Sequence, residues 1–177
     1  DVAVVVGDGQ SVWVGTDVGI NRVRDGAVAV VRLPDGTHVG PVRALLPLGP
    51  GEIWVGTATR GLVRFSSRGV GRWDTGDGLP DNWVHAIVLA RDETLWVGTN
   101  RGIAVWRDGV LAVPPGLEPL SRESVYTIHE GPDGVLWFGT GGGGLYRWDG
   151  KALGRVTSRQ GLFNDTVFAI LDDGVGH

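Results

Sequence analysis

Residues 95–99 read Leu-Trp-Val-Gly-Thr, and this short stretch decides the fold because the chain repeats it. The four copies are Val12-Trp13-Val14-Gly15-Thr16, Ile53-Trp54-Val55-Gly56-Thr57, Leu95-Trp96-Val97-Gly98-Thr99 and Leu136-Trp137-Phe138-Gly139-Thr140. Their tryptophans are separated by 41, 42 and 41 residues. A fixed period of this length is typical of a repeat architecture.

A second motif keeps the same period, and in it a variable residue follows a valine. Its copies are Val42-Arg43-Ala44-Leu45, Val84-His85-Ala86-Ile87, Val125-Tyr126-Thr127-Ile128 and Val167-Phe168-Ala169-Ile170. Pairing each residue with the one 83 positions later aligns the chain without a gap. We infer a duplicated unit of two repeats, which leaves open an engineered or recently amplified sequence.

One repeat contains four short strand patterns. In the third copy they cover residues 84–89, 94–98, 102–107 and 110–113, and turn residues separate them. Four antiparallel strands in about 42 residues are typical of one blade of a β-propeller. We therefore predict an all-β propeller with four-stranded blades, and no 3.6-residue periodicity supports a helical solenoid.

The repeat also predicts how the chain is divided. We expect one propeller or partial propeller over residues 1–177, with about four blades. The blades are expected at roughly residues 1–41, 42–83, 84–124 and 125–166, followed by an extra first strand at 167–171. Four blades and one additional strand leave three arrangements open: a fragment of a longer ring, two chains sharing an eight-bladed ring, or a four-bladed monomer. We expect self-association or completion by further blades, because a free strand edge pairs readily.

Composition excludes several classes of function. The formal net charge of −4 gives no basic surface for nucleic acid or acidic membranes. With no Cys there is neither a disulfide nor a thiol nucleophile, and the four His lie at unrelated repeat positions, so we expect no metal or cofactor. No catalytic motif is recognisable, so we predict that the chain is not an enzyme. Because the chain contains no Met, we expect it to have been cut from a longer protein, processed or trimmed.

The motifs resemble the two-component regulator propeller repeat. The segment Gly78-Leu79-Pro80-Asp81-Asn82-Trp83-Val84-His85-Ala86-Ile87, the Trp motif after it, and Gly144-Leu145-Tyr146-Arg147-Trp148-Asp149 carry this resemblance, whereas residues 36–41 and 119–124 depart from it. The resemblance implies a sensor domain on the outer side of the bacterial cytoplasmic membrane, coupled to a histidine kinase and often tuned to sugars. A periplasmic or extracytoplasmic location is expected on this ground alone.

Strand direction predicts where a binding site would lie. Alternating strands place the loop between the second and third strands on the same face as the segment between blades. These loops vary in sequence, and variable loops on a rigid scaffold commonly bind ligands. The predicted ligand-binding residues on this face are Arg60, Asn82, Trp83, Arg101, Arg122 and Asp165.

Each candidate also has a structural interpretation. The repeated tryptophans are expected to pack between blades, Asn82 is expected to shape its own turn, and Trp83 fits either a lid or a packing residue. The leading hypothesis is a non-catalytic sensory propeller for a small polar ligand, with a saccharide suggested by the resemblance. The alternatives are a structural or protein-interaction scaffold and, less favoured, a propeller lyase or hydrolase that would need acids such as Glu123 and Asp165 to converge.

Overall fold

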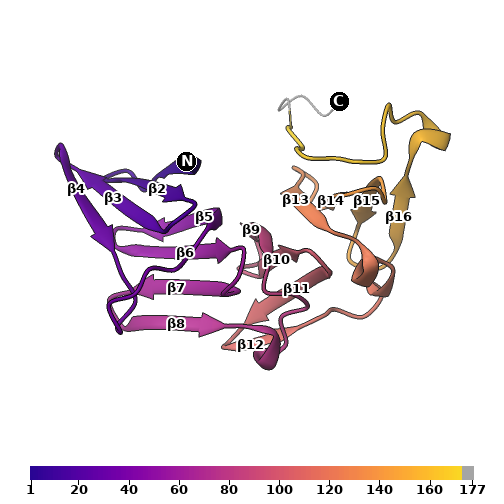
Figure 1. The fold of residues 1–177 in the computed structure, drawn as a ribbon. Helices are drawn as coiled ribbons and strands as arrows, with labels where there is room; N and C mark the ends of the chain where they lie inside the picture. Colours follow the sequence, from indigo (N-terminus) through magenta and orange to yellow (C-terminus); the bar gives the residue numbers. More distant parts are fainter. Residues whose placement is uncertain (173–177) are drawn as a thin grey trace.

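The structure, a computed structural model, describes residues 1–172 and contains four separate antiparallel sheets (Figure 1). The first sheet consists of β1 (Val2–Gly7), β2 (Val12–Thr16), β3 (Ile20–Arg24) and β4 (Ala27–Val31). The second consists of β5 (Val42–Gly49), β6 (Glu52–Thr57), β7 (Leu62–Ser66) and β8 (Gly69–Trp73). The third consists of β9 (Val84–Leu89), β10 (Leu95–Thr99), β11 (Gly102–Arg107) and β12 (Val110–Ala112). The fourth consists of β13 (Val125–Glu130), β14 (Leu136–Thr140), β15 (Leu145–Trp148) and β16 (Leu153–Val156).

Each sheet is an up-and-down meander, and the sheets follow one another around an open arc. Strands pair in chain order within every sheet, and the innermost strands β1, β5, β9 and β13 contact one another in succession. Figure 1 shows the outermost strands along the outside of the arc, with a gap between the first and last sheets. The predicted all-β propeller with four-stranded blades is confirmed.

In the two interior sheets, the strand that contains the motif Trp packs against both neighbouring sheets. Trp54 packs toward the third sheet in a core with Leu95 and Val97, whereas Ile53 and Val55 pack back against the first sheet. Side chains alternate between the faces of a strand, so one short motif supplies both interfaces. The predicted packing of the repeated tryptophans between blades is therefore found wherever a blade follows.

The two ends of the arc lack one neighbour each. Val12, which takes the place of Ile53 in the first sheet, is 42% exposed because none of the described sheets packs against this face. Trp137 is only half-buried, because no complete sheet packs opposite it within residues 1–172. Both ends thus present apolar side chains that the interior sheets bury.

The Gly-Thr pair of the motif allows the sheets to approach and closes the next loop. A Cβ on Gly98 would lie 2.9 Å from the carbonyl oxygen of Val125, which begins the neighbouring inner strand. The Thr99 hydroxyl donates to the carbonyl oxygen of Gly102 at 2.9 Å, and the other three threonines make the equivalent bond. These four bonds are buried or partly buried, so they satisfy backbone groups that water reaches poorly.

The predicted extra first strand at 167–171 is not a strand. The Val167 N–H donates to the carbonyl oxygen of Thr140 at 2.8 Å, so the segment starts where a first strand would start. Residues 168–171 then leave this edge without forming a ladder. A first strand is held by the Trp strand of its own blade, and none of the described residues supplies that strand here.

Three short 3-10 helices in the segments between sheets were not predicted. They are η1 (Thr75–Asp77), η2 (Glu118–Arg122) and η3 (Ser158–Gln160). Capping boxes begin two of them, formed by Asp74 with Asp77 and by Thr157 with Gln160. Because these two helices lie 83 residues apart, their common structure agrees with the inferred duplication.

Candidate functional site

One backbone hydrogen bond recurs in all four sheets and fixes the predicted variable face. The residue after each Gly-Thr pair donates its backbone N–H to a carbonyl oxygen at the start of the inner strand of the same sheet. The accepting residue directly precedes the first residue of that inner strand. The bonds run from Asp17 to Asp1 (3.2 Å), Ala58 to Pro41 (2.8 Å), Asn100 to Trp83 (3.0 Å) and Gly141 to Ser124 (2.9 Å). The loops between second and third strands therefore lie beside the starts of the inner strands, as strand direction predicted.

The inner strands share an irregularity at this face. In each sheet the register between the first and second strands shifts at the second residue of the inner strand, which is Ala3, Arg43, His85 or Tyr126. A bulge of this kind redirects a side chain and is frequent beside functional sites. The variable residue of the Val motif is thus the bulged one.

Three aromatic contacts connect these positions into a continuous row. The rings of Trp83 and His85 stack with centroids 5.7 Å apart, and His85 meets the edge of Tyr126 at 4.9 Å. Tyr126 stacks in turn on Phe168 at 5.3 Å. Arg43 completes the row, with its guanidinium carbon 5.9 Å from the centre of the Trp83 ring. We call Arg43, Trp83, His85, Tyr126 and Phe168 the aromatic row.

Polar side chains lie beside the row. Asp81 accepts a hydrogen bond from the Trp83 N–H at 2.7 Å and lies 3.9 Å from the Nε of Arg101. The amide oxygen of Asn100 accepts from the Ser124 hydroxyl at 2.9 Å. The site therefore combines flat aromatic surfaces with an amide, a carboxylate and two guanidinium groups.

The surroundings of His85 shift its pKa. Its partial burial lowers the pKa below the usual value for histidine, and the positive charge of Arg43 acts in the same direction, while Asn100 and Asp81 oppose the shift. Its Nε2 atom is buried and has no hydrogen-bond partner among residues 1–172. The imidazole is thus favoured in its neutral form at this face.

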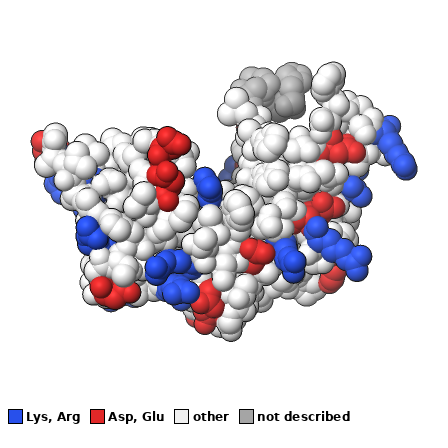
Figure 2. Space-filling model, viewed as in Figure 1, with Lys and Arg blue, Asp and Glu red and all other residues white. Residues whose placement is uncertain are grey.

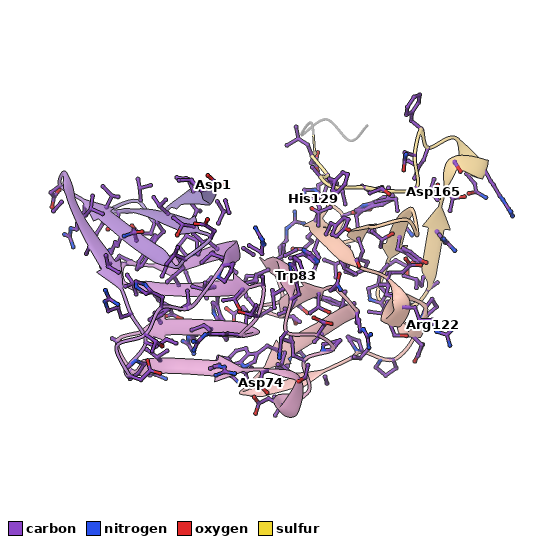
Figure 3. The ribbon with its side chains drawn as sticks, viewed as in Figure 1. Asp1, Asp74, Trp83, Arg122, His129 and Asp165 are labelled. Atoms are coloured by element: carbon purple, nitrogen blue, oxygen red, sulfur yellow. The ribbon has the colours of Figure 1, made fainter. Side chains whose placement is uncertain are left out.

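Of the six residues predicted to bind ligand, Trp83 and Arg101 come together. Trp83 is 40% exposed, and Asp81 links its backbone to Arg101. Figure 3 shows Trp83 near the middle of the arc, far from Arg122 and Asp165 on the last sheet's side.

Two predicted residues hold their own loops. The amide oxygen of Asn82 accepts from the Thr75 N–H at 3.0 Å, as the structural interpretation of this residue expected. Asp165, 83 residues later, accepts from the Ser158 N–H at 2.5 Å and from its hydroxyl at 3.2 Å. These groups stabilise the 3-10 turns, so they do not join the aromatic row.

The remaining two predicted residues lie outside the row. Hydrogen bonds from Thr37 chiefly lower the pKa of Asp35, and the positive charge of Arg60 adds to this effect, which places Arg60 toward the first sheet. Arg122 ends η2 with an exposed side chain, and none of the described residues forms a hydrogen bond or ion pair with that side chain.

Sequence reasoning missed four members of the row, namely Arg43, His85, Tyr126 and Phe168. Their signal was present in the Val motif, where this position alone changes between basic and aromatic residues while its neighbours stay small or apolar. What the pattern did not contain was the bulge, which turns these side chains toward one another.

The acids considered for catalysis belong to separate networks. Glu123 accepts from the Tyr146 hydroxyl at 3.2 Å, and burial together with this carboxylate raises the pKa of Tyr146. Asp165 is bound to Ser158 instead. Within residues 1–172, no cluster of three or more His, Asp or Glu could hold a metal ion.

Charge on the surface is mixed. Figure 2 shows Lys and Arg interspersed with Asp and Glu over the face in view, together with broad uncharged areas. Among the described residues, none forms a helix that is long and apolar enough to cross a membrane.

Comparison with known proteins identifies the repeat. Residues 78–101 and 119–142 match the family model described as "Two component regulator propeller". A sequence comparison with curated proteins finds no match.

Solved structures share the fold at low sequence identity. The extracellular domain of BT3049 from B. thetaiotaomicron, described as a hybrid two component system, matches with a TM-score of 0.80 and 20% identity, over 98% of this chain and 24% of that one. The extracellular domain of BT4673 from the same organism, described as a one component system, matches with a TM-score of 0.61 and 22% identity. The match covers 97% of this chain and 30% of that one. A catalytically inactive variant of virginiamycin B lyase from Staphylococcus aureus matches with a TM-score of 0.60 and 20% identity. The match covers 88% of this chain and 55% of that one. The chain thus spans about a quarter to a third of the two extracellular domains.

Proposed function

We propose that this chain, which carries the two-component regulator propeller repeat, is a non-catalytic part of a sensory propeller that binds a small polar ligand at its variable face. The observation that carries the proposal is the aromatic row from Trp83 to Phe168. The fold shared with extracellular domains of two component and one component systems supports a sensory role outside the cytoplasm.

A saccharide is the ligand class that suits these groups. Sugar rings have apolar faces and hydroxyl edges, so they are matched by exposed aromatic rings beside fixed polar groups. Trp83 supplies the exposed ring, and Arg101 with Asn100 supplies donors and an acceptor.

The test is calorimetric titration of the chain against a panel of neutral saccharides, with tryptophan fluorescence recorded in parallel. Trp83→Ala is expected to weaken the binding of any active sugar by about tenfold or more, the usual range for an aromatic anchor. Phe163→Ala is the matched control, since Phe163 is fully exposed and takes no part in the row. Absence of heat and of any fluorescence change across the panel would remove the saccharide proposal.

A protein-interaction scaffold is the second candidate, and the two open ends of the arc favour it. The first sheet exposes Val12, and the last sheet leaves Trp137 half-buried beside a cavity of about 520 Å³. At every interior interface, the face of one sheet that carries the motif Trp packs against the opposite face of the next sheet. The partner that fits either end is therefore another sheet of the same repeat. We infer that further blades, from a longer chain or a second copy, cover these faces.

A further inference from the structure

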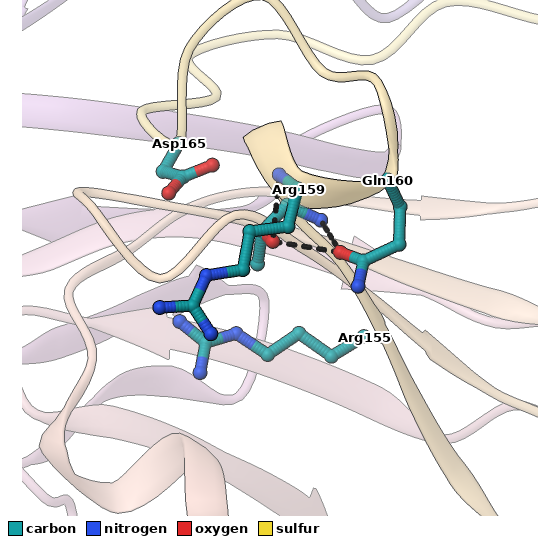
Figure 4. A pocket seen from close by; sticks show the side chains of 5 residues that line it. Arg155, Arg159, Gln160 and Asp165 are labelled. Carbon is teal, nitrogen blue, oxygen red and sulfur yellow. Dashed lines mark hydrogen bonds between the residues drawn. The ribbon is translucent and has the colours of Figure 1, made fainter.

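A polar cleft lies at the outer corner of the last sheet, away from the aromatic row. It has a volume of about 460 Å³, and its walls are Arg155, Thr157, Arg159, Gln160 and Asp165 (Figure 4). Figure 4 shows the two guanidinium ends reaching toward the same side of the cleft. Among residues 1–172, no carboxylate lies within ion-pair distance of either arginine.

Arg155 is held in place without a charged partner. Its Nε donates to the carbonyl oxygen of Gly143 at 2.6 Å, and its guanidinium carbon lies 5.3 Å from the centre of the Tyr146 ring. These contacts leave both terminal nitrogens free of hydrogen bonds within the described chain. A guanidinium fixed in this way loses little side-chain entropy when it binds an anion.

The duplicated unit provides an internal comparison, because residue 72 corresponds to residue 155. Arg72 makes the same backbone bond, from its Nε to the carbonyl oxygen of Arg60 at 3.3 Å. Its Nη2, however, donates to Asp74 at 2.9 Å. In the second sheet the arginine is thus already neutralised.

The last sheet lacks the acidic residues that surround the equivalent arginine in the second sheet. Thr157 replaces Asp74, Gln160 replaces Asp77, and Arg159 stands where the second sheet has Gly76. Both 3-10 turns keep their capping boxes, so the local fold is unchanged while two acids are lost and one cation is gained. The one acid added in return, Asp165, points both of its oxygens at Ser158.

We propose that this cleft binds the oxyanion group of a small ligand, which is a sulfate, a phosphate or a carboxylate. Arg155 and Arg159 would donate to its oxygens, and the Thr157 side chain also lines the cleft. Guanidinium groups suit planar and tetrahedral oxyanions because two N–H groups can bind one anion together. The cleft is separate from the aromatic row, so either site can be tested without the other.

The experiment is titration of the whole chain with inorganic sulfate, inorganic phosphate and glucuronate at constant ionic strength, followed by calorimetry and by the arginine Nε–H signals in NMR. Glucose serves as the uncharged counterpart of glucuronate. The ranking of the three anions distinguishes a sulfate or phosphate group from a sugar carboxylate. We expect saturable binding that shifts the Nε–H signal of Arg155.

Two variants locate the site. Arg159→Gln should weaken anion binding by about tenfold, the effect of losing one charge-assisted hydrogen bond. Thr157→Asp restores the acid of the second sheet at a capping position that accepts it, and it should weaken binding similarly while the fold is kept. Arg72→Gln is the matched control and should leave the affinity unchanged.

A transplant gives the converse test. The triple variant Asp74→Thr, Gly76→Arg and Asp77→Gln gives the second sheet's corner the same residues at these three positions, and it should create a second site of comparable affinity. No saturable anion binding by the unmodified chain would overturn the proposal. Equal affinities of the unmodified chain, Arg159→Gln and Thr157→Asp would overturn it as well.

Discussion

The ring of Phe168 lies parallel to that of Tyr126, with an interplanar angle of 6° and centroids 5.3 Å apart. Phe168 belongs to a segment that forms no strand, yet it takes the same motif position as Tyr126 in the repeat. The aromatic row is therefore organised by the repeat and continues past the last complete sheet.

Removal of Phe168 should separate binding from stability. The side chain is 73% exposed, so Phe168→Ala should change the free energy of unfolding by less than about 0.5 kcal/mol, as is usual for surface substitutions. Chemical denaturation checks this value. If the row is a binding surface, the same variant weakens ligand binding, whereas a large loss of stability would place Phe168 in the core.

The repeated tryptophans should differ in their contributions to stability. Trp54→Ala removes a buried side chain between two sheets and should cost about 3–5 kcal/mol. Trp137→Ala should cost clearly less, because that ring is only half-buried and none of the described sheets packs opposite it. Urea denaturation of both variants measures the difference, and equal losses would contradict the assignment of Trp137 to an open end.

The motif glycine is expected to tolerate no larger residue. Gly98→Ala places a Cβ against the backbone of Val125, so it should destabilise the chain by about 1–3 kcal/mol through overpacking. Gly154→Ala is the control, since its nearest neighbour would lie 3.8 Å away. Thermal unfolding compares the two. A neutral Gly98→Ala would mean that the sheets can separate slightly at no cost.

Stability should fall in mildly acidic solution because of His85. Its folded pKa is lowered, chiefly by burial, so the unfolded chain binds the proton more readily. The free energy of unfolding should therefore decrease as the pH falls through the unfolded pKa, about 6.5, toward the lower folded one. His85→Phe keeps a ring in the row and should lack this part of the pH dependence. If the free energy of unfolding depends on pH in the same way for the unmodified chain and for His85→Phe, His85 is not the cause.

The open ends should mediate head-to-tail association of the chain. Sedimentation of the unmodified chain should show concentration-dependent assembly, because Val12 and Trp137 lie on complementary faces. Val12→Arg and Trp137→Arg should each be monomeric, since each variant has lost one face of every possible contact. An equimolar mixture of the two should form a heterodimer through the remaining pair of faces. A monomeric unmodified chain would contradict coverage by a second copy and leave only blades of a longer chain to cover these faces.

The sheets could be predicted from the repeat because a local sequence pattern specifies each strand. Residues 84–89 and 102–107 form strands with the predicted bounds, and the strands predicted at 94–98 and 110–113 are found at Leu95–Thr99 and Val110–Ala112. The variable face also followed, since it depends only on strand direction. These features require no knowledge of distant contacts.

The site was predicted less well for a physical reason. Asn82 has the chemistry of a ligand-binding residue, but the nearby Thr75 N–H takes its amide oxygen. His85 and Tyr126 point toward one another because of a register shift, which depends on the paired strand and leaves no mark of its own in the sequence. The strand predicted at 167–171 failed similarly, since it needs a partner beyond its own residues.

The backbone bond between each second loop and the start of an inner strand has an evolutionary consequence. In each sheet, for example between Asp17 and Asp1 or between Gly141 and Ser124, this bond joins main-chain atoms. It therefore does not depend on the side chains that surround it. Mutations at the rim can then alter recognition while the scaffold beneath keeps its shape. Diversification of specificity and maintenance of architecture are in this way assigned to different atoms.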